Sequence, residues 1–407
     1  MAVGLKPAAG LLPVKGIRLA STSAGIYART REDLALVEFD ESAAVSAVFT
    51  RNDFSAAPVI VARKHLMQYK GHRFCLINAG NANAGTGSKG VEDAMATCEN
   101  LASLAGCKTE AVLPFSTGVI GQDLPVDKIT SAFPYLMGNL TETNWNKCSQ
   151  AIITTDTMTK GISKQIDLDG ITVTVTGIAK GSGMIRPDMA TMLAFIGTDA
   201  SVDNKVLDKI LNDVVTTSFN RICVDGDMST NDACVLIATG KSGHKTISAP
   251  DSDNYHKLQD VVNEVCTHLA TAIVRDGEGA TKFICIQVEQ GGNRQECLDI
   301  AYAIATSPLV KTAFFASDPN WGRILAAIGR AGVTDLNINN ISMYINDCLI
   351  VEKGYRATEY TEESGKQAMK SDELLLRVVL ERGKHQETMW TCDLSHEYVR
   401  INAEYRS

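Results

Sequence analysis

The sequence predicts a mixed α/β protein with a smaller C-terminal subdomain. Short apolar runs alternate with helical patterns in the first half of the chain, and a β-hairpin and two amphipathic helices lie in the middle. Beyond residue 335, strand-like runs surround one further helix near residues 358–371. Because the chain has neither an internal repeat nor a low-complexity linker, we expect one mixed body rather than a string of separate modules.

The first half contains two buried strands separated by a helix. Residues 74–78 and 111–115 are short apolar runs of the kind that forms buried strands. Between them, residues 91–106 have helical periodicity, and the glycine that ends this segment is a common helix terminator. We therefore expect a strand, a helix and a second strand in succession.

The middle of the chain carries the clearest local signals. Residues 164–168 and 171–178 flank an Asp-Gly dipeptide, which between alternating β-branched residues is typical of a β-hairpin. Apolar residues at helical spacing from residue 203 onward predict an amphipathic helix, and residues 258–273 predict another. Strands near the C-terminus are expected in four apolar runs: residues 341–347, 348–352, 374–383 and 389–394.

The charge balance limits the classes of partner. The chain has 39 Lys and Arg residues against 47 Asp and Glu residues, a formal net charge of −8. It therefore lacks the basic surface that generic binding to nucleic acid or anionic membranes requires. No segment reaches about 18 uninterrupted apolar residues, and Gly and Pro interrupt the hydrophobic N-terminal segment before a signal-peptide core forms. We expect a soluble, cytoplasmic protein without a membrane span.

The cysteines and histidines predict neither disulfide bonds nor a metal site. The 11 cysteines are an odd number, and none lies in a C-x-x-C pair. Disulfide scaffolds are typical of short secreted chains with an even set, so we expect reduced thiols that fill the core of a cytosolic protein. The seven histidines show no zinc-ligand spacing, and no metal is expected.

Three short motifs resemble ligand sites but fail on their context. Residues 85–90 match G-x-G-x-x-G, yet six residues separate them from the preceding strand, whereas a dinucleotide site needs the first glycine close behind it. Residues 240–242 resemble the end of a phosphate-binding loop, but Val235 occupies the position of the required glycine. Residues 225–229 resemble a calcium loop, but Leu236 replaces the bidentate glutamate. This last loop is better interpreted as polar support for a nearby site.

The segment with the most chemical information is residues 180–200, KGSGMIRPDMATMLAFIGTDA. A glycine-rich turn leads through Pro187 to Ala190-Thr191, and a hydrophobic strand follows. Taken alone, Thr191 is most simply the first residue of that strand. The alternative is that the chain breaks before Thr191, which then becomes a new N-terminus.

An N-terminal threonine has a specific chemistry. A threonine hydroxyl held in a strained turn can attack the carbonyl carbon that precedes it, and water then opens the resulting ester. The product carries a hydroxyl nucleophile and an α-amine on one residue. Because the ordinary pKa of an α-amine is about 7.7–8.0, a useful fraction is unprotonated near neutral pH and can accept the hydroxyl proton. The pattern alone leaves both interpretations of Thr191 open.

A resemblance decides between them. The segment around Thr191 closely resembles the cleavage segment of the ornithine acetyltransferase family, the bifunctional glutamate N-acetyltransferases of arginine biosynthesis. Six further segments resemble blocks of this family, in family order and across nearly the whole chain, from about residue 10 to residue 407. They are FSTGVIG (115–121), AIITTDT (151–157), FNRICVDGDMSTNDA (219–233), RDGEGATK (275–282), SDPNWGRI (317–324) and INAEYRS (401–407).

The resemblance implies a layered α/β body of the N-terminal-nucleophile type that cleaves itself between Ala190 and Thr191. Cleavage gives an α chain of residues 1–190 and a β chain of residues 191–407, which together form one catalytic body. Thr191 is then both the nucleophile of cleavage and the carrier of the acetyl group. The family also implies an assembly of two α and two β chains.

The family's functional positions carry over to this sequence. Its oxyanion hole maps to Thr117 and Gly118, whose hydroxyl and backbone N–H are suitable donors to a tetrahedral oxyanion. Lys180 can neutralise the α-carboxylate of an amino acid, and Glu278 can pair with the side-chain ammonium of ornithine. The choice of Thr154 over its neighbour Thr155 as a substrate contact stays open. The substrate-contacting set is Thr154, Lys180, Thr191, Glu278, Asn402 and Ser407.

The implied reaction moves an acetyl group from N2-acetyl-L-ornithine to L-glutamate through an acetyl-Thr191 intermediate. No metal or redox cofactor is expected, and acetyl-CoA is an additional donor that no residue of the sequence decides. A rival within the same chemistry is a self-cleaving aminopeptidase or amidohydrolase in which water is the acceptor. Two further rivals are an uncleaved dinucleotide-binding protein that uses residues 85–90 and a non-catalytic metabolite-binding protein.

Overall fold

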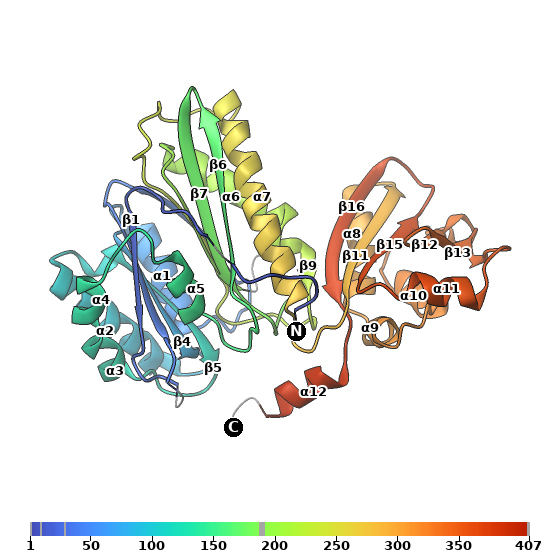
Figure 1. The fold of residues 1–407 in the computed structure, drawn as a ribbon, viewed down its shortest axis with the longest axis horizontal. Coiled ribbons are helices and arrows are strands. Elements are labelled where there is room, and N and C mark those ends of the chain that lie inside the picture. The colour runs from blue at the N-terminus through green and yellow to red at the C-terminus, as the bar shows by residue number, and fades with distance from the viewer. Residues whose placement is uncertain (1, 9, 28–29, 187–191, 405–407) are drawn as a thin grey trace.

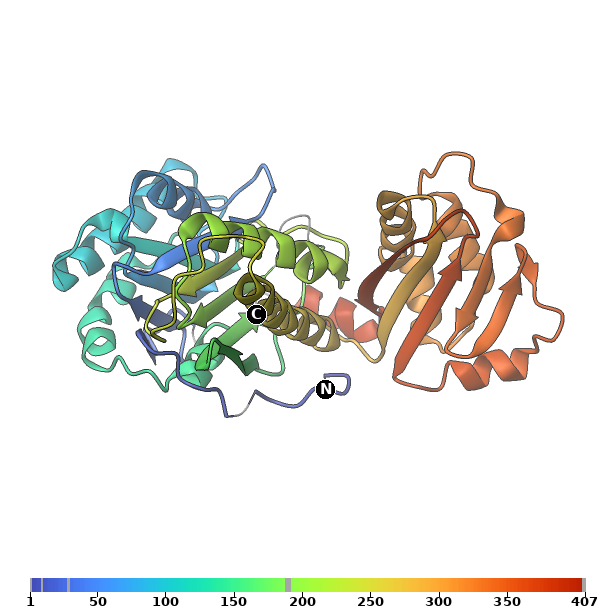
Figure 2. The ribbon, with the colours of Figure 1, turned by 90° about the horizontal axis from the view of Figure 1, so that it is seen from above.

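The computed structural model describes residues 2–8, 10–27, 30–186 and 192–404, which form two lobes (Figure 1). The larger lobe contains two β-sheets with helices, and the smaller, C-terminal lobe is built on a third sheet. The C-terminal helix leaves the smaller lobe and runs back toward the larger one (Figure 2).

The first sheet of the larger lobe has four strands in the order β1-β2-β4-β5. The predicted strand–helix–strand succession is confirmed by β4 (Phe74–Asn81), α2 (Gly87–Ala105) and β5 (Val112–Val119). Because β4 and β5 run parallel, their connection must cross over the sheet, and α2 provides that crossover. The two strands before them, β1 (Ile17–Thr22) and β2 (Leu34–Phe39), pair antiparallel.

The second sheet has five strands in the order β3-β10-β8-β7-β6. The predicted hairpin is confirmed, because β6 and β7 are antiparallel and joined by the Asp-Gly dipeptide. Strand β8 lies between β7, antiparallel to it, and β10, parallel to it. The bounds are β3 (Ala44–Phe49), β6 (Lys160–Leu168), β7 (Ile171–Lys180), β8 (Leu193–Thr198) and β10 (Ala233–Ala238).

The two sheets pack face to face, with helices on both outer faces. Between them lies one apolar core in which the rings of Phe115 and Phe195, from opposite sheets, meet edge to face at 5.1 Å. The apolar side of α2 covers the outer face of the first sheet. The helices α6 (Asn204–Thr217) and α7 (Asp253–Arg275), both predicted, cover the second sheet. The expected layered α/β arrangement is confirmed.

Shorter elements complete the larger lobe. Among the helices, α1 contributes to the cores on both sides of the first sheet. Their bounds are α1 (Ala57–Gln68), η1 (Thr109–Ala111), α3 (Val126–Ser131), α4 (Phe133–Gly138), α5 (Trp145–Ala151) and η2 (Phe219–Arg221).

The smaller lobe is a seven-stranded sheet in the order β14-β13-β12-β15-β11-β16-β9, with helices packed on one face. Its strands are β9 (Ile222–Cys223), β11 (Phe283–Gly291), β12 (Ser342–Ile345), β13 (Cys348–Glu352), β14 (Tyr355–Arg356), β15 (Glu373–Val379) and β16 (His385–Cys392). Its helical segments are α8 (Arg294–Ala305), α9 (Pro308–Phe315), α10 (Trp321–Gly329), η3 (Ile338–Asn340), α11 (Glu362–Ala368) and α12 (His396–Ala403).

Several predicted boundaries are wrong. The third sheet already includes β11, so the smaller lobe begins well before residue 335. The helix expected near residues 358–371 is shorter, and α2 begins earlier than residue 91. Strand β5 continues through residues 116–118, beyond the strand expected at residues 111–115, because the parallel ladder with β4 continues to that point.

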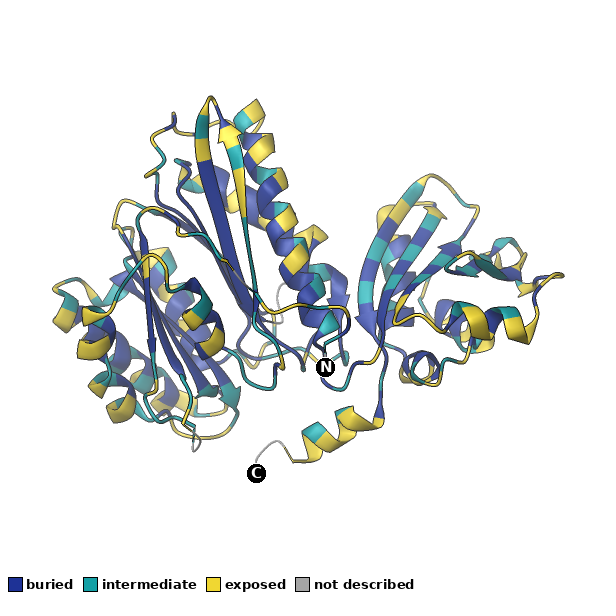
Figure 3. Ribbon diagram, viewed as in Figure 1, coloured by how far each residue is buried: buried dark blue, intermediate teal, exposed yellow. Residues whose placement is uncertain are grey.

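Burial follows the layers (Figure 3). All 11 cysteines are free and eight of them are buried, as expected of core-filling thiols. Helix α12 has no buried residue and projects from the smaller lobe. Within the described ranges, no helix is both long and apolar enough to cross a bilayer.

Candidate active site

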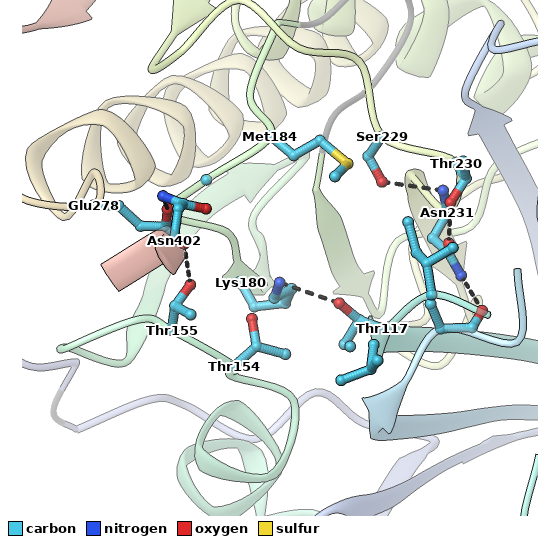
Figure 4. A pocket seen from close by; sticks show the side chains of 15 residues that line it. Thr117, Thr154, Thr155, Lys180, Met184, Ser229, Thr230, Asn231, Glu278 and Asn402 are labelled. Atoms are coloured by element: carbon cyan, nitrogen blue, oxygen red, sulfur yellow. Dashed lines mark hydrogen bonds between the residues drawn. The ribbon is translucent and has the colours of Figure 1, made fainter. Parts of the chain in front are cut away.

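A cavity of about 280 Å³ lies in the larger lobe, where β5 and β7 end and β10 begins (Figure 4). Residues from distant parts of the chain line it, including one from α12. They are Ala82, Thr117, Gly118, Val119, Ile120, Thr154, Thr155, Lys180, Gly183, Met184, Ser229, Thr230, Asn231, Glu278 and Asn402.

The structure brings together the predicted site residues that it describes. These are Thr117, Gly118, Thr154, Thr155, Lys180, Glu278 and Asn402, and all of them line the cavity. Ala190, Thr191 and Ser407 lie outside the described residues. Met192, which follows Thr191 in the chain, is buried and accepts a hydrogen bond from Ala233 N at 2.8 Å. The described part of the chain therefore resumes just before β8. This strand lies between β7, which ends at the cavity, and β10, which begins there.

The predicted oxyanion-hole residues occupy the end of β5. Lys180 Nζ donates a hydrogen bond to Thr117 Oγ1 at 3.2 Å. Since the ammonium has only hydrogens to give, the Thr117 hydroxyl is the acceptor and its own hydrogen stays available as a donor. Gly118 has φ +136°, a conformation that L side chains rarely adopt.

The approach of two backbones explains the glycine at position 118. A Cβ on Gly118 would overlap the carbonyl carbon of Gly80 and the amide nitrogen of Asn81 in β4. We expect Gly118→Ala to lower the free energy of unfolding by roughly 1–3 kcal/mol, measured by denaturant titration. Gly121→Ala is the matched control, because Gly121 has a positive φ but open space around it. Equal losses in the two variants would contradict the overlap.

At the end of the cavity away from Thr117 lies the carboxylate of Glu278, which accepts a hydrogen bond at each of its two oxygens. Thr155 Oγ1 donates to Glu278 Oε1 at 2.7 Å, and Asn402 Nδ2 donates to Glu278 Oε2 at 2.7 Å. A Cβ on Gly183 would lie 2.6 Å from Glu278 Oε1, so a larger residue at this position would displace the carboxylate. Thr154 and Thr155, between which the sequence left the substrate contact undecided, both line the cavity. The hydroxyl of Thr155 contacts Glu278.

Lys180 is a buried ammonium at the centre of the cavity. Burial lowers the pKa of Lys180, and the nearby Lys160 acts in the same direction. The carboxyl groups of Asp156, Asp232 and Glu278 oppose this by favouring the charged lysine. The protonation of Lys180 therefore depends on the balance between burial, which lowers its pKa, and the acidic groups, which raise it.

A fully buried ion network supports the cavity floor. Lys160 Nζ lies 2.6 Å from Asp156 Oδ1 and 2.6 Å from Asp276 Oδ2. Burial alone would raise the pKa of Asp156, but the charges of Lys160 and Lys180 hold it well below its ordinary value. Asp156 also accepts hydrogen bonds from the backbone of Thr154 and Gly181. The network thus ties the loop that carries the two threonines to the turn after Lys180.

The polar loop that was predicted to support a nearby site contributes to the lining of the cavity. Its residues Ser229, Thr230 and Asn231, which were not named individually as site residues, form one wall. Asn231 Nδ2 donates to the carbonyl oxygens of Ala82 and Ser116, which joins this loop to the first sheet. Met184 lines the cavity with φ +56°, and no sequence signal indicated it.

Comparison with known proteins identifies the family. A family model described as the ArgJ family matches residues 18–407. The chain belongs to the ArgJ family. The resemblance drawn from the sequence motifs is therefore confirmed, and the match covers every described residue of the ArgJ cavity.

Relatives of this ArgJ-family chain extend over its full length. The arginine biosynthesis bifunctional proteins ArgJ of Pseudomonas fluorescens (strain Pf0-1) and Pseudomonas syringae pv. tomato are each 52% identical over 407 residues, covering 100% of both chains. The crystal structure of the arginine biosynthesis bifunctional protein ArgJ from Bacillus halodurans is 38% identical with a TM-score of 0.50. It covers 52% of this chain and 99% of the solved chain.

Proposed function

We propose that this protein transfers the acetyl group of N2-acetyl-L-ornithine to L-glutamate, giving L-ornithine and N-acetyl-L-glutamate. The observation that carries the proposal is the joint lining of one cavity by Thr117 and Gly118, Lys180, and the Glu278–Asn402 pair in a chain of the ArgJ family. Hydrogen-bond donors for an oxyanion and charged groups of both signs are thus present in one small space.

The proposed reaction has two displacements. Thr191 Oγ attacks the acetyl carbonyl carbon of acetylornithine while its α-amine takes the hydroxyl proton. Thr117 and Gly118 donate hydrogen bonds to the oxyanion, the proton passes to the leaving nitrogen, and ornithine departs. The amine of glutamate then attacks the carbonyl carbon of the acetyl-Thr191 ester, the α-amine of Thr191 passes a proton from the attacking nitrogen to Thr191 Oγ as the ester bond breaks, and N-acetylglutamate leaves. No metal or redox step enters this sequence.

The charged residues of the cavity favour an amino acid over water as the acceptor of the acetyl group. Lys180 is positioned to pair with an α-carboxylate, and Glu278 with the side-chain ammonium of ornithine. Glutamate carries the same α-carboxylate, so Lys180 can bind the acceptor as well as the donor, and a hydrolase with water as acceptor does not need this contact. The assay that separates the two is ornithine release with and without glutamate. We expect release to depend on glutamate, whereas equal rates would favour the hydrolase.

Self-cleavage between Ala190 and Thr191 is part of the proposal. The solved Bacillus halodurans chain aligns over 99% of its length but covers only 52% of this chain. A β chain of residues 191–407 is about half of the 407 residues, so this proportion supports a polypeptide divided near its middle. The same proposal includes an assembly of two α and two β chains, a cytoplasmic location and acetyl-CoA as a second acetyl donor.

Glu278→Gln tests the ammonium contact. Glutamine keeps the shape of the side chain but loses the charge, so the KM for acetylornithine is expected to rise about 10–100-fold, the equivalent of one charged hydrogen bond. We expect kcat to stay within a few-fold. Steady-state kinetics measure both, with Glu296→Gln, a buried glutamate paired to Arg382 in the smaller lobe, as the matched control. An unchanged KM would remove Glu278 from substrate binding.

A further inference from the structure

Asp225 is an acid of the polar loop that the proposed mechanism does not use. Its carboxylate accepts a hydrogen bond from Met184 N at 2.6 Å and another from Ile185 N at 2.9 Å. It also accepts longer bonds from Asp227 N at 3.2 Å and from Tyr398 OH at 3.3 Å. The first acid of the loop that resembles a calcium site in the sequence therefore binds two successive backbone N–H groups of its own chain.

The backbone of Met184 explains why a carboxylate stands at this position. Met184 has φ +56°, a conformation that residues other than glycine rarely adopt. A turn of this kind can direct two successive N–H groups into one concavity, which suits an anion. Asp225 places one oxygen on each of the two N–H groups, so it stabilises a turn that a methionine does not favour by itself.

The chain next to Asp225 strengthens this hold. Val224 N donates to Ile185 O at 2.8 Å, so both backbone polar groups of Ile185 are bound by two consecutive residues. The Ile185 side chain is 1% exposed and belongs to the same apolar core as Val224. The chain is therefore fixed at Ile185, five residues before the proposed cleavage site at Ala190.

The other end of the same segment is held by the other end of the same loop. Ala233 N donates to Met192 O at 2.8 Å, directly after Thr191 in the chain. Residues 224–233 thus bind the chain both before and after the Ala190–Thr191 bond. The positions at which the chain enters and leaves this segment depend on a single loop.

We propose that Asp225 is a positioning residue for self-cleavage, which holds the chain upstream of the Ala190–Thr191 bond so that the Ala190 carbonyl is presented to Thr191 Oγ. The inference rests on the proposed function, in which this bond is broken by its own threonine. In that step the bond from Thr191 Oγ to the carbonyl carbon forms, the C–N bond breaks, and the hydroxyl proton passes to the leaving nitrogen. Water then hydrolyses the ester and leaves a carboxylate on Ala190.

The connectivity of the chain predicts that Asp225 acts on cleavage and not on acetyl transfer. Before the bond breaks, Ala190 is joined through the chain to the residues that Asp225 holds. After the break, Thr191 is joined only to Met192, which Ala233 holds. A displacement of about 1 Å can slow a step between positioned groups about 100-fold, so loss of the upstream hold should slow cleavage far more than transfer.

Asp225→Asn tests this prediction. Asparagine keeps the shape of the side chain, but an amide NH2 replaces one of the two acceptor oxygens, so one of the two N–H groups loses its partner. The full chain is made in a cell-free system with a pulse of labelled amino acid, and the decay of the full-length band on a denaturing gel gives the cleavage rate. We expect cleavage to slow about 10–100-fold. The kcat per cleaved molecule is expected to stay within a few-fold of the wild type.

Asp227→Asn is the matched control. Asp227 is an exposed acid of the same loop, and its contact with Asp225 is made by a backbone N–H that the substitution leaves in place. We expect cleavage at the wild-type rate. Thermal unfolding shows whether each variant is folded, and Asp225→Ser gives the same comparison should Asp225→Asn fail to fold.

Two results would overturn the proposal: a folded Asp225 variant that cleaves at the wild-type rate, or one in which cleavage and kcat fall by the same factor. Cleavage is measured without acetylornithine or glutamate. A wild-type chain that cleaves but transfers no acetyl group would therefore contradict the proposed reaction and leave the role of Asp225 intact. A wild-type chain that stays whole would contradict self-cleavage and this role together.

Discussion

Replacement of Thr191 by alanine is expected to leave the polypeptide whole and to abolish acetyl transfer. Alanine has no hydroxyl to attack the carbonyl of Ala190, so no ester forms and no new α-amine appears. The same change removes the acetyl carrier, so both functions are lost in one step. A denaturing gel measures cleavage and an ornithine-release assay measures transfer, and we expect one full-length band and no detectable rate.

Thr191→Ser provides the matched control, because serine keeps the hydroxyl and the ability to become an N-terminal nucleophile. We expect this variant to cleave, more slowly than the wild type, and to retain part of the activity. Cleavage of Thr191→Ala at the same bond would show that another residue is the nucleophile.

The second large effect is expected for Thr117→Val. Valine fills nearly the same volume but donates no hydrogen bond, so one oxyanion donor is lost while Gly118 remains. Loss of one such donor reduces kcat by about 10²–10³. Pre-steady-state measurement of ornithine release reports the acetylation step directly. We expect the KM for acetylornithine to change little, since the oxyanion exists only in the transition state.

Thr176→Val is the control for this substitution. Thr176 also lies buried in a strand of the larger lobe, and its hydroxyl contacts Leu12 O and Ser163 rather than the cavity. We expect its kcat to match the wild type. A Thr117→Val variant with normal kcat and raised KM would make Thr117 a ground-state contact.

Local structure was the part of the fold that the sequence predicted well. The Asp-Gly hairpin is correct because turn chemistry and strand alternation both lie within a few residues of each other. Helix α6 is correct because its inward face, from Val206 to Val215, has one clear period. The extent of β5 was missed because its last residues depend on the parallel partner β4, about 40 residues away, and not on local propensity.

For the candidate site, too, some residues could be predicted from the sequence, whereas others could be found only from the structure. Motif resemblance supplied Thr117, Lys180 and Glu278, and the structure brings them to one cavity. It did not supply the buried Lys160 network, because one of the two acids that pair with Lys160, Asp276, lies 116 residues away in the sequence. Burial and ion pairs of this kind become visible only when the strands are placed side by side.

The proposed mechanism depends most directly on the break before Thr191, and intact-mass analysis of freshly purified protein measures whether this bond is cleaved. The predicted result is two polypeptides, with masses equal to residues 1–190 and 191–407 and an N-terminal threonine on the second. A single mass of 43.8 kDa in an enzyme that still transfers acetyl groups, or a new N-terminus at any other residue, would contradict it.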